Sequence, residues 1–74
     1  MRTVTLANAP LATPLTLCAV PTELRHQLSR LGLRPGAGFA VVRRSTGGGR
    51  IVSVSGARVA IGRPVLARLE AEVV

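Results

Sequence analysis

The amino-acid sequence predicts a single all-β domain with one short helix, folded as a small, partly open barrel of about five strands. Three observations support this prediction. The chain has 74 residues, which is enough for one domain only. From residue 38 onward, apolar and polar residues alternate in short runs with the period of half-buried strands. Glycines and prolines separate the runs, so the connections are tight, and this pattern fits a small barrel better than a sandwich.

The composition indicates how so small a domain is stabilised. Hydrophobic residues make up 47% of the chain, and almost all of them are Val, Leu, Ile and Ala. Cys18 is the only cysteine, so the chain cannot form an internal disulfide, and Cys18 with His26 cannot supply four zinc ligands. A core of this size seldom contributes more than about 3–5 kcal/mol of net stability. We therefore expect tight aliphatic packing, with no structural metal and no cofactor.

Residues 1–14 are predicted to form an extended N-terminal lead-in, because they contain two prolines and no clear period. Residues 15–20 are the first predicted strand, and Cys18 within it is expected to be a small hydrophobic residue that is buried or half-buried. No run of 18 apolar residues occurs, so no membrane-spanning segment is predicted, and the expected location is the cytoplasm.

The period changes to that of a helix after residue 20. Residues 21–23 are a helix-start signal, with Thr22 as the expected N-cap and Glu23 near the positive end of the helix dipole. Leucines recur at helical spacing on one face, namely Leu24, Leu28 and Leu31. His26 lies about 200° round the helix from the first of them, so we expect it to face solvent.

The stretch LGLRPG, residues 31–36, is predicted to end the helix and lead into the next strand. With Leu31 as the C-cap, Gly32 takes the left-handed position that glycine tolerates best. Pro35 and Gly36 fit the centre of a type II turn. Arg34 has no structural task in this arrangement.

Three strands are then predicted in a meander, over residues 38–44, 50–55 and 58–61. The alternation predicts that three residues share one face of the first of them: Phe39, Val41 and Arg43. Residues 46–49 are expected to be a mobile hairpin tip, because their glycines lie between two strands and not before a helix, as a phosphate-binding loop requires. Residues 55–58 are predicted to form a two-residue turn of type II′, with Gly56 at its first central position.

The C-terminal part is predicted to contain one turn of helix and a closing strand. Pro64 can open a single helical or 3₁₀ turn that ends near Leu66. The closing strand alternates apolar residues with two glutamates, over residues 69–73.

The sequence offers little for catalysis. The only acids are Glu23, Glu70 and Glu72, and the single His and single Cys lie on different elements. A carboxylate pair for acid–base work, a Cys–His nucleophile and a hydrolytic metal centre therefore all lack parts, and we expect no enzymatic activity.

The charge favours anionic partners. The net charge is +7, and all ten basic residues are arginines. A basic nucleic-acid-binding barrel is therefore an alternative function, although Phe39 is the only aromatic residue and a base-stacking platform is missing. We expect no specific nucleic acid as a partner. Weak self-association is a further possibility that the sequence leaves open.

The order of several motifs carries a family resemblance. These are LGLRPG at residues 31–36, FAVVRR at 39–44 and IVSVSGARVAIGRPVLARLEAEV at 51–73, with Leu24 and Arg30 in the helix before them. Together they resemble the FeoA family of small SH3-like barrels, a fold that also occurs as the C-terminal domain of metal-dependent repressors of the diphtheria-toxin-repressor type. The resemblance implies an SH3-like barrel over residues 1–74.

The resemblance also implies a function in iron homeostasis. It predicts a non-enzymatic, cytoplasmic accessory protein of bacterial ferrous iron uptake, recruited to the inner face of the membrane by contact with the cytoplasmic part of a FeoB-type transporter. Ligands suited to a transition metal are nearly absent from the chain, so we expect any link to iron to run through this partner. The expected contact residues are the exposed arginines, Arg34, Arg43, Arg44, Arg58 and Arg63.

Overall fold

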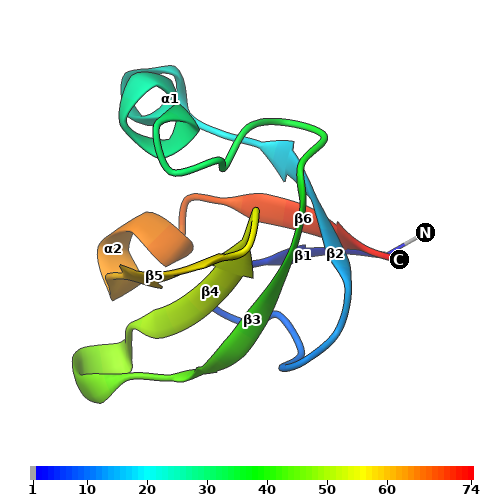
Figure 1. Cartoon of the computed structure of the whole chain (residues 1–74), viewed down its shortest axis with the longest axis vertical. Helices are drawn as coiled ribbons and strands as arrows, with labels where there is room; N and C mark the ends of the chain where they lie inside the picture. Colours follow the sequence, from blue (N-terminus) through cyan, green and yellow to red (C-terminus); the bar gives the residue numbers. More distant parts are fainter. Residues whose placement is uncertain (1) are drawn as a thin grey trace.

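The computed structural model describes residues 2–74 and contains, within them, one six-stranded antiparallel sheet with two short α-helices (Figure 1). In chain order the elements are β1 (Arg2–Thr5), β2 (Leu15–Ala19), α1 (Thr22–Ser29), β3 (Gly38–Arg44), the 3₁₀ turn η1 (Thr46–Gly48), β4 (Arg50–Val54), β5 (Ala57–Ile61), α2 (Arg63–Leu66) and β6 (Glu70–Val73). The strand order is β1-β6-β2-β3-β4-β5, so β1 and β5 are the edges. The strongly bent sheet confirms the predicted all-β class and an open barrel, with six strands where the sequence indicates about five.

The N-terminal segment belongs to the sheet. The sequence predicts only an extended lead-in over residues 1–14, of which Met1 lies outside the described residues, whereas β1 pairs antiparallel with the whole of β6. Leu6 follows β1, is fully buried, and its N–H donates to the carbonyl oxygen of Leu69 at 3.1 Å. β1 has one half-buried apolar residue, Val4, and the strand that it pairs with, β6, lies at the far end of the chain. The local sequence pattern is therefore too weak to predict this strand.

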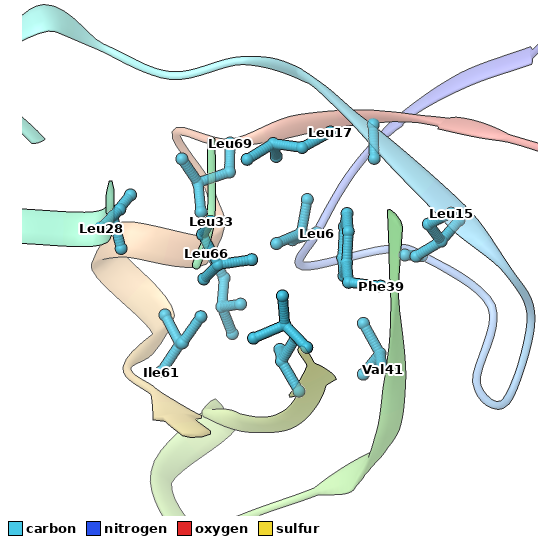
Figure 2. Close-up of a cluster of buried hydrophobic side chains, with 14 of the residues drawn as sticks. Leu6, Leu15, Leu17, Leu28, Leu33, Phe39, Val41, Ile61, Leu66 and Leu69 are labelled. Atoms are coloured by element: carbon cyan, nitrogen blue, oxygen red, sulfur yellow. The ribbon is translucent and has the colours of Figure 1, made fainter. Parts of the chain in front are cut away.

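The core is aliphatic apart from Phe39, as the composition predicts, and it lies inside the curve of the sheet (Figure 2). Its buried residues come from strands, helices and connections alike, namely Leu6, Ala9, Leu15, Leu17, Val20, Leu28, Leu33, Phe39, Val41, Val52, Val54, Ile61, Leu66, Leu69 and Ala71. Burial of one leucine or valine side chain contributes about 1.5–3 kcal/mol, so these residues are the main source of stability.

Helix α1 begins differently from the prediction. Thr22 is the first helical residue and not the N-cap, because Pro21 occupies the capping position with extended dihedral angles (φ −55°, ψ 142°) and no side chain caps the helix. Glu23 lies in the first turn as predicted. The apolar stripe is shorter than predicted, since Leu28 is buried but Leu31, beyond the helix end, is 41% exposed.

The end of α1 has the predicted glycine cap. Gly32 has a φ of +91°, in the left-handed region. Its N–H donates to the carbonyl oxygen of Ser29, and the N–H of Leu33 donates to that of Leu28, both at 3.0 Å. These are the two hydrogen bonds of a Schellman motif, which satisfies carbonyl groups that a helix end leaves free.

The turn that follows is the predicted type II turn. The N–H of Ala37 donates to the carbonyl oxygen of Arg34 at 2.9 Å, and Gly36 at the third position has a positive φ. This turn leads directly into β3.

The turn between β4 and β5 differs from the predicted type II′. Val54 pairs with Ala57, so the two central residues are Ser55 and Gly56, with φ values of +52° and +78°. Two positive φ values define a type I′ turn. The reason is the register, which is set by the buried valines of β4 and places the turn one residue earlier than the sequence suggests.

A bulge in β3 separates two neighbouring arginines. Phe39 and Val41 are buried as predicted, but the register shifts after Val41, and Val42 is the extra residue. Arg43 therefore pairs with Ile51 on the outer face of the sheet and does not share the inner face. Arg44 pairs with Arg50 instead.

The C-terminal elements match the prediction closely. Pro64 lies in the first turn of α2, and Leu66 at the end of this helix is fully buried. β6 begins at Glu70, one residue after the predicted start, and alternates a buried Ala71 with more exposed glutamates.

Candidate functional site

The surface carries a net positive charge, because the chain has too few acidic residues to balance its arginines. The chain has ten arginines and three glutamates. Within residues 2–74 a single ion pair forms, between Arg68 and Glu23, and it joins α1 to the connection before β6. Both side chains of this pair are exposed, so it contributes at most about 1 kcal/mol. Most of the other arginines are exposed and stay available for contacts with anions.

Two of the five predicted contact residues share the outer face of strands β3, β4 and β5. We call this surface the outer face and define it by Arg43, Ile51, Ser53, Arg58 and Ala60, which the strand register brings side by side. Arg43 and Arg58 are exposed, and the residues between them are small or half-buried. The arrangement offers two cations around a modest apolar strip, which suits the surface of another protein.

Arg34 lies in a different place. It is exposed in the type II turn and borders a shallow hollow of about 360 Å³ together with Pro35 and Ser55. The hollow lies between the α1–β3 connection and the β4–β5 turn. Arg34 therefore lies at the end of the molecule where β4 turns into β5.

The remaining two predicted residues meet in a second hollow, which the sequence does not indicate as a site. Arg44 and Arg63 both line it, although they come from β3 and α2. We call it the basic hollow; it has a volume of about 390 Å³, and its polar lining includes Asn8, Arg44, Ser45, Arg50 and Arg63. The hollow joins residues from the N-terminal segment, the β3–β4 loop and the start of α2.

Arg50 is the functional candidate that sequence reasoning missed. Its side chain is only 9% exposed, and its Nη1 donates to the carbonyl oxygen of Ala9 at 2.6 Å. The sequence pattern could have predicted its burial. Arg50 stands two residues before Val52 and four before Val54, so the alternation places its side chain on the inward face of the strand. An arginine at an inward position is rare unless it has a partner.

The glycine-rich loop packs against the basic hollow. A Cβ atom at Gly49 would lie 2.8 Å from the Ser45 Oγ and 2.9 Å from the carbonyl oxygen of Ile61. A Cβ atom at Gly48 would lie 3.0 Å from the Cδ of Arg63. The absence of side chains at these two positions lets the loop approach α2 and places the stem of Arg63 beside it. The predicted mobility of this loop stays a prediction.

Cys18 is half-buried on β2, as predicted. Its Sγ lies 3.6 Å from the carbonyl oxygen of Thr16 and 3.6 Å from Oε1 of Glu72. Partial burial raises the pKa of the thiol, and the carboxylate of Glu72 raises it further. The raised pKa keeps Cys18 in the unreactive thiol form at neutral pH.

Alkylation kinetics test this account of Cys18. Iodoacetamide should modify the folded chain at pH 7.5 more slowly than it modifies free cysteine, because less thiolate is present. Glu72→Gln should speed the reaction, since losing the negative charge lowers the thiol pKa. Glu23→Gln, on another element, is the control and should leave the rate unchanged. Equal rates for Glu72→Gln and the unmodified chain would contradict the role of the carboxylate.

Metal ligands do not gather anywhere in the described part of the chain. No group of three or more His, Cys, Asp or Glu side chains is found there, and His26 faces solvent on α1 as predicted. A separate search of residues 2–74 found no helix long and apolar enough to cross a membrane.

Comparison with protein families gives a match over nearly the whole chain. Residues 4–73 match the family model described as "FeoA domain". A search of curated proteins returned no significant match.

Solved structures share the fold. The crystal structure described as iron uptake regulatory protein (FeoA) is 27% identical and superposes over the full length of both chains with a TM-score of 0.87. Iron(II) transport protein A from Clostridium thermocellum is 20% identical, with a TM-score of 0.84 over 96% of this chain and 46% of that one. The manganese regulator SloR is 15% identical, with a TM-score of 0.82 over 95% of this chain and 34% of that one. These matches confirm the SH3-like fold that the resemblance predicts.

Proposed function

The chain belongs to the FeoA family, and on this basis we propose that it is a non-enzymatic accessory protein of bacterial ferrous iron uptake that acts by binding a FeoB-type transporter. Family membership itself indicates a small protein related to ferrous iron transport. The observation that carries the proposal is the match over residues 4–73, together with full-length superposition on a FeoA structure. In the proposal the chain works in the cytoplasm and reaches the membrane through its partner.

The surface chemistry supports action by protein contact. Arg43 and Arg58 on the outer face have no carboxylate partner within the described residues and are free to meet acidic groups of another protein. Charges at such positions steer encounter and select the partner, and they do so without any chemistry at a reacting centre. The half-buried Ile51 between them offers an apolar contact that the partner can cover.

The proposed partner surface is the cytoplasmic part of the transporter. We expect an acidic patch there, complementary to the outer face. Arg34 extends the basic surface at the β4–β5 end of the molecule and is a further contact in this proposal. This proposal places the contact at the outer face and Arg34, whereas Arg44 and Arg63 line the basic hollow.

Calorimetric titration against the soluble domain of the cognate transporter tests the proposal. We expect saturable binding at micromolar concentration that weakens as salt is raised. The double variant Arg43→Glu with Arg58→Glu should weaken binding by about tenfold or more, because like charges then face each other. Arg30→Glu, at an exposed arginine directly after the end of α1, is the matched control and should bind normally.

Two outcomes would contradict the proposal. One is the absence of detectable binding at high micromolar concentration of both proteins. The other is binding of DNA or RNA that persists at physiological salt in a gel-shift series and prefers a sequence or strand type. Purely electrostatic binding to phosphates weakens steeply as salt rises, so binding of this kind would be specific. The second outcome would favour the nucleic-acid alternative.

A further inference from the structure

Arg50 has no part in the proposed protein contact, yet it carries a buried charge. Arg50 is 9% exposed, and among residues 2–74 its side chain makes one hydrogen bond, to the carbonyl oxygen of Ala9. No carboxylate pairs with it among residues 2–74, where the one ion pair is Arg68–Glu23. A buried charge without a counter-charge is costly, so native proteins normally supply one. The counter-charge for Arg50 is therefore expected from outside the chain.

The free donors of Arg50 reach the basic hollow. A guanidinium group carries five N–H donors, and the carbonyl oxygen of Ala9 accepts from one nitrogen, Nη1. No fully buried side-chain nitrogen or oxygen in the described residues lacks a partner. The remaining nitrogens of Arg50 therefore lie at the small exposed part of the side chain, and Arg50 lines the basic hollow.

Two more guanidinium groups border the same hollow. Arg44 pairs with Arg50 across β3 and β4, so the two side chains stand on the same side of the sheet. Arg63 comes from the start of α2, and its stem lies beside Gly48. Three positive charges in one hollow repel each other unless an anion lies between them. Ser45 adds a hydroxyl group that can donate a further hydrogen bond.

We propose that the basic hollow is a binding site for a phosphate group, either free phosphate or the phosphate of a small phosphorylated molecule. A phosphate carries up to two negative charges and several acceptor oxygens, which match the planar, paired donors of several guanidinium groups. A lone carboxylate carries one charge and two oxygens, so it satisfies three arginines less well. The volume of about 390 Å³ leaves room for an organic part beside the phosphate. Recognition is by arginine side chains, and the glycines serve only to let the loop pack closely.

Titration with inorganic phosphate tests the site. At constant ionic strength, phosphate should bind the full chain with 1:1 stoichiometry and raise its melting temperature with concentration, as a ligand of the folded state must. Sodium acetate and sodium chloride are the comparison salts and should raise the melting temperature by less. Arg44→Gln and Arg63→Gln should each weaken phosphate binding at least tenfold. Both side chains are exposed, so the variants should fold normally.

Arg43→Gln and Arg58→Gln are the matched controls, because they remove the same charge from the outer face and should leave phosphate affinity unchanged. A parallel titration with glycerol phosphate distinguishes the two sources of the phosphate group. Tighter binding of the ester, lost in Arg44→Gln, supports a small phosphorylated molecule, whereas equal affinity supports free phosphate.

Three results would overturn the proposal. The first is a phosphate effect no larger than that of chloride at the same ionic strength. The second is an equal loss of affinity in Arg43→Gln and Arg44→Gln, which would show non-specific charge attraction. The third is an acidic peptide that binds at Arg44 and Arg63 and is not displaced by phosphate, which would make the hollow a peptide site.

Discussion

Replacing Leu6 with alanine should lower the free energy of unfolding by about 2–5 kcal/mol, the usual cost of removing a fully buried leucine side chain. Leu6 is 0% exposed and packs in the core inside the curve of the sheet (Figure 2). Its N–H donates to the carbonyl oxygen of Leu69. A domain of this size has only about 3–5 kcal/mol of net stability, so Leu6→Ala should leave a large unfolded fraction at room temperature. Urea unfolding followed by circular dichroism measures the loss.

Leu11→Ala is the matched control for this prediction. Leu11 lies in the same N-terminal segment but is 40% exposed, so its truncation should change stability by no more than about 0.5 kcal/mol. Equally small losses in the two variants would contradict the prediction, because they would show that Leu6 and the segment before β2 are not part of the core.

Gly32→Val should destabilise the fold by about 1–3 kcal/mol, which is the cost of holding a residue with a side chain in a sparsely populated backbone conformation. Gly32 has a φ of +91°, and a branched side chain is especially unfavourable there. A Cβ atom at this position would also lie 3.1 Å from the Ser55 Oγ, so the Ser55 side chain would have to move by a few tenths of an ångström. Thermal unfolding should show the effect as a melting temperature several degrees lower.

Gly38→Val provides the comparison for Gly32→Val. Gly38 starts β3 without a positive φ, and a Cβ atom there would meet nothing within 4 Å. Valine is well tolerated in strands, so this variant should be as stable as the unmodified chain or slightly more stable. An unchanged melting temperature in Gly32→Val would refute the cap at the end of α1.

The bulge in β3 gives two adjacent arginines different surroundings. Because Val42 is an extra residue, Arg43 turns to the outer face while Arg44 pairs with Arg50 beside the basic hollow. The proposed protein contact and the proposed phosphate site therefore use different arginines. Substitutions at Arg43 and Arg44 can separate the two proposals experimentally, although the residues are neighbours in the chain.

Local patterns predicted most of the sheet and the core. The alternation over residues 38–61 identified β3, β4 and β5, together with buried residues such as Val52, Val54 and Ile61. The cap at Gly32 was predicted as well, because the need for a positive φ depends on residues only a few positions away. The β4–β5 turn was misplaced by one residue, since its type depends on how two strands align.

The candidate sites were predicted only in part. The five arginines were named from their type and their expected exposure, and all five are exposed. Their grouping was not predictable, because Arg44 and Arg63 meet only after the chain has returned through β4 and β5. The burial of Arg50 was visible in the alternation, but its position beside two other arginines was not.

The sequence by itself determined the class of fold, the aliphatic core and the family, because these depend on local periodicity, composition and ordered motifs. Only the tertiary structure decided that β1 joins the sheet, that Val42 bulges and that the buried Arg50 lines one hollow with Arg44 and Arg63. The physical reason is that strand pairing and burial are set by residues far apart in the chain. A buried charge can therefore be recognised as a binding site only when its neighbours from other elements are known.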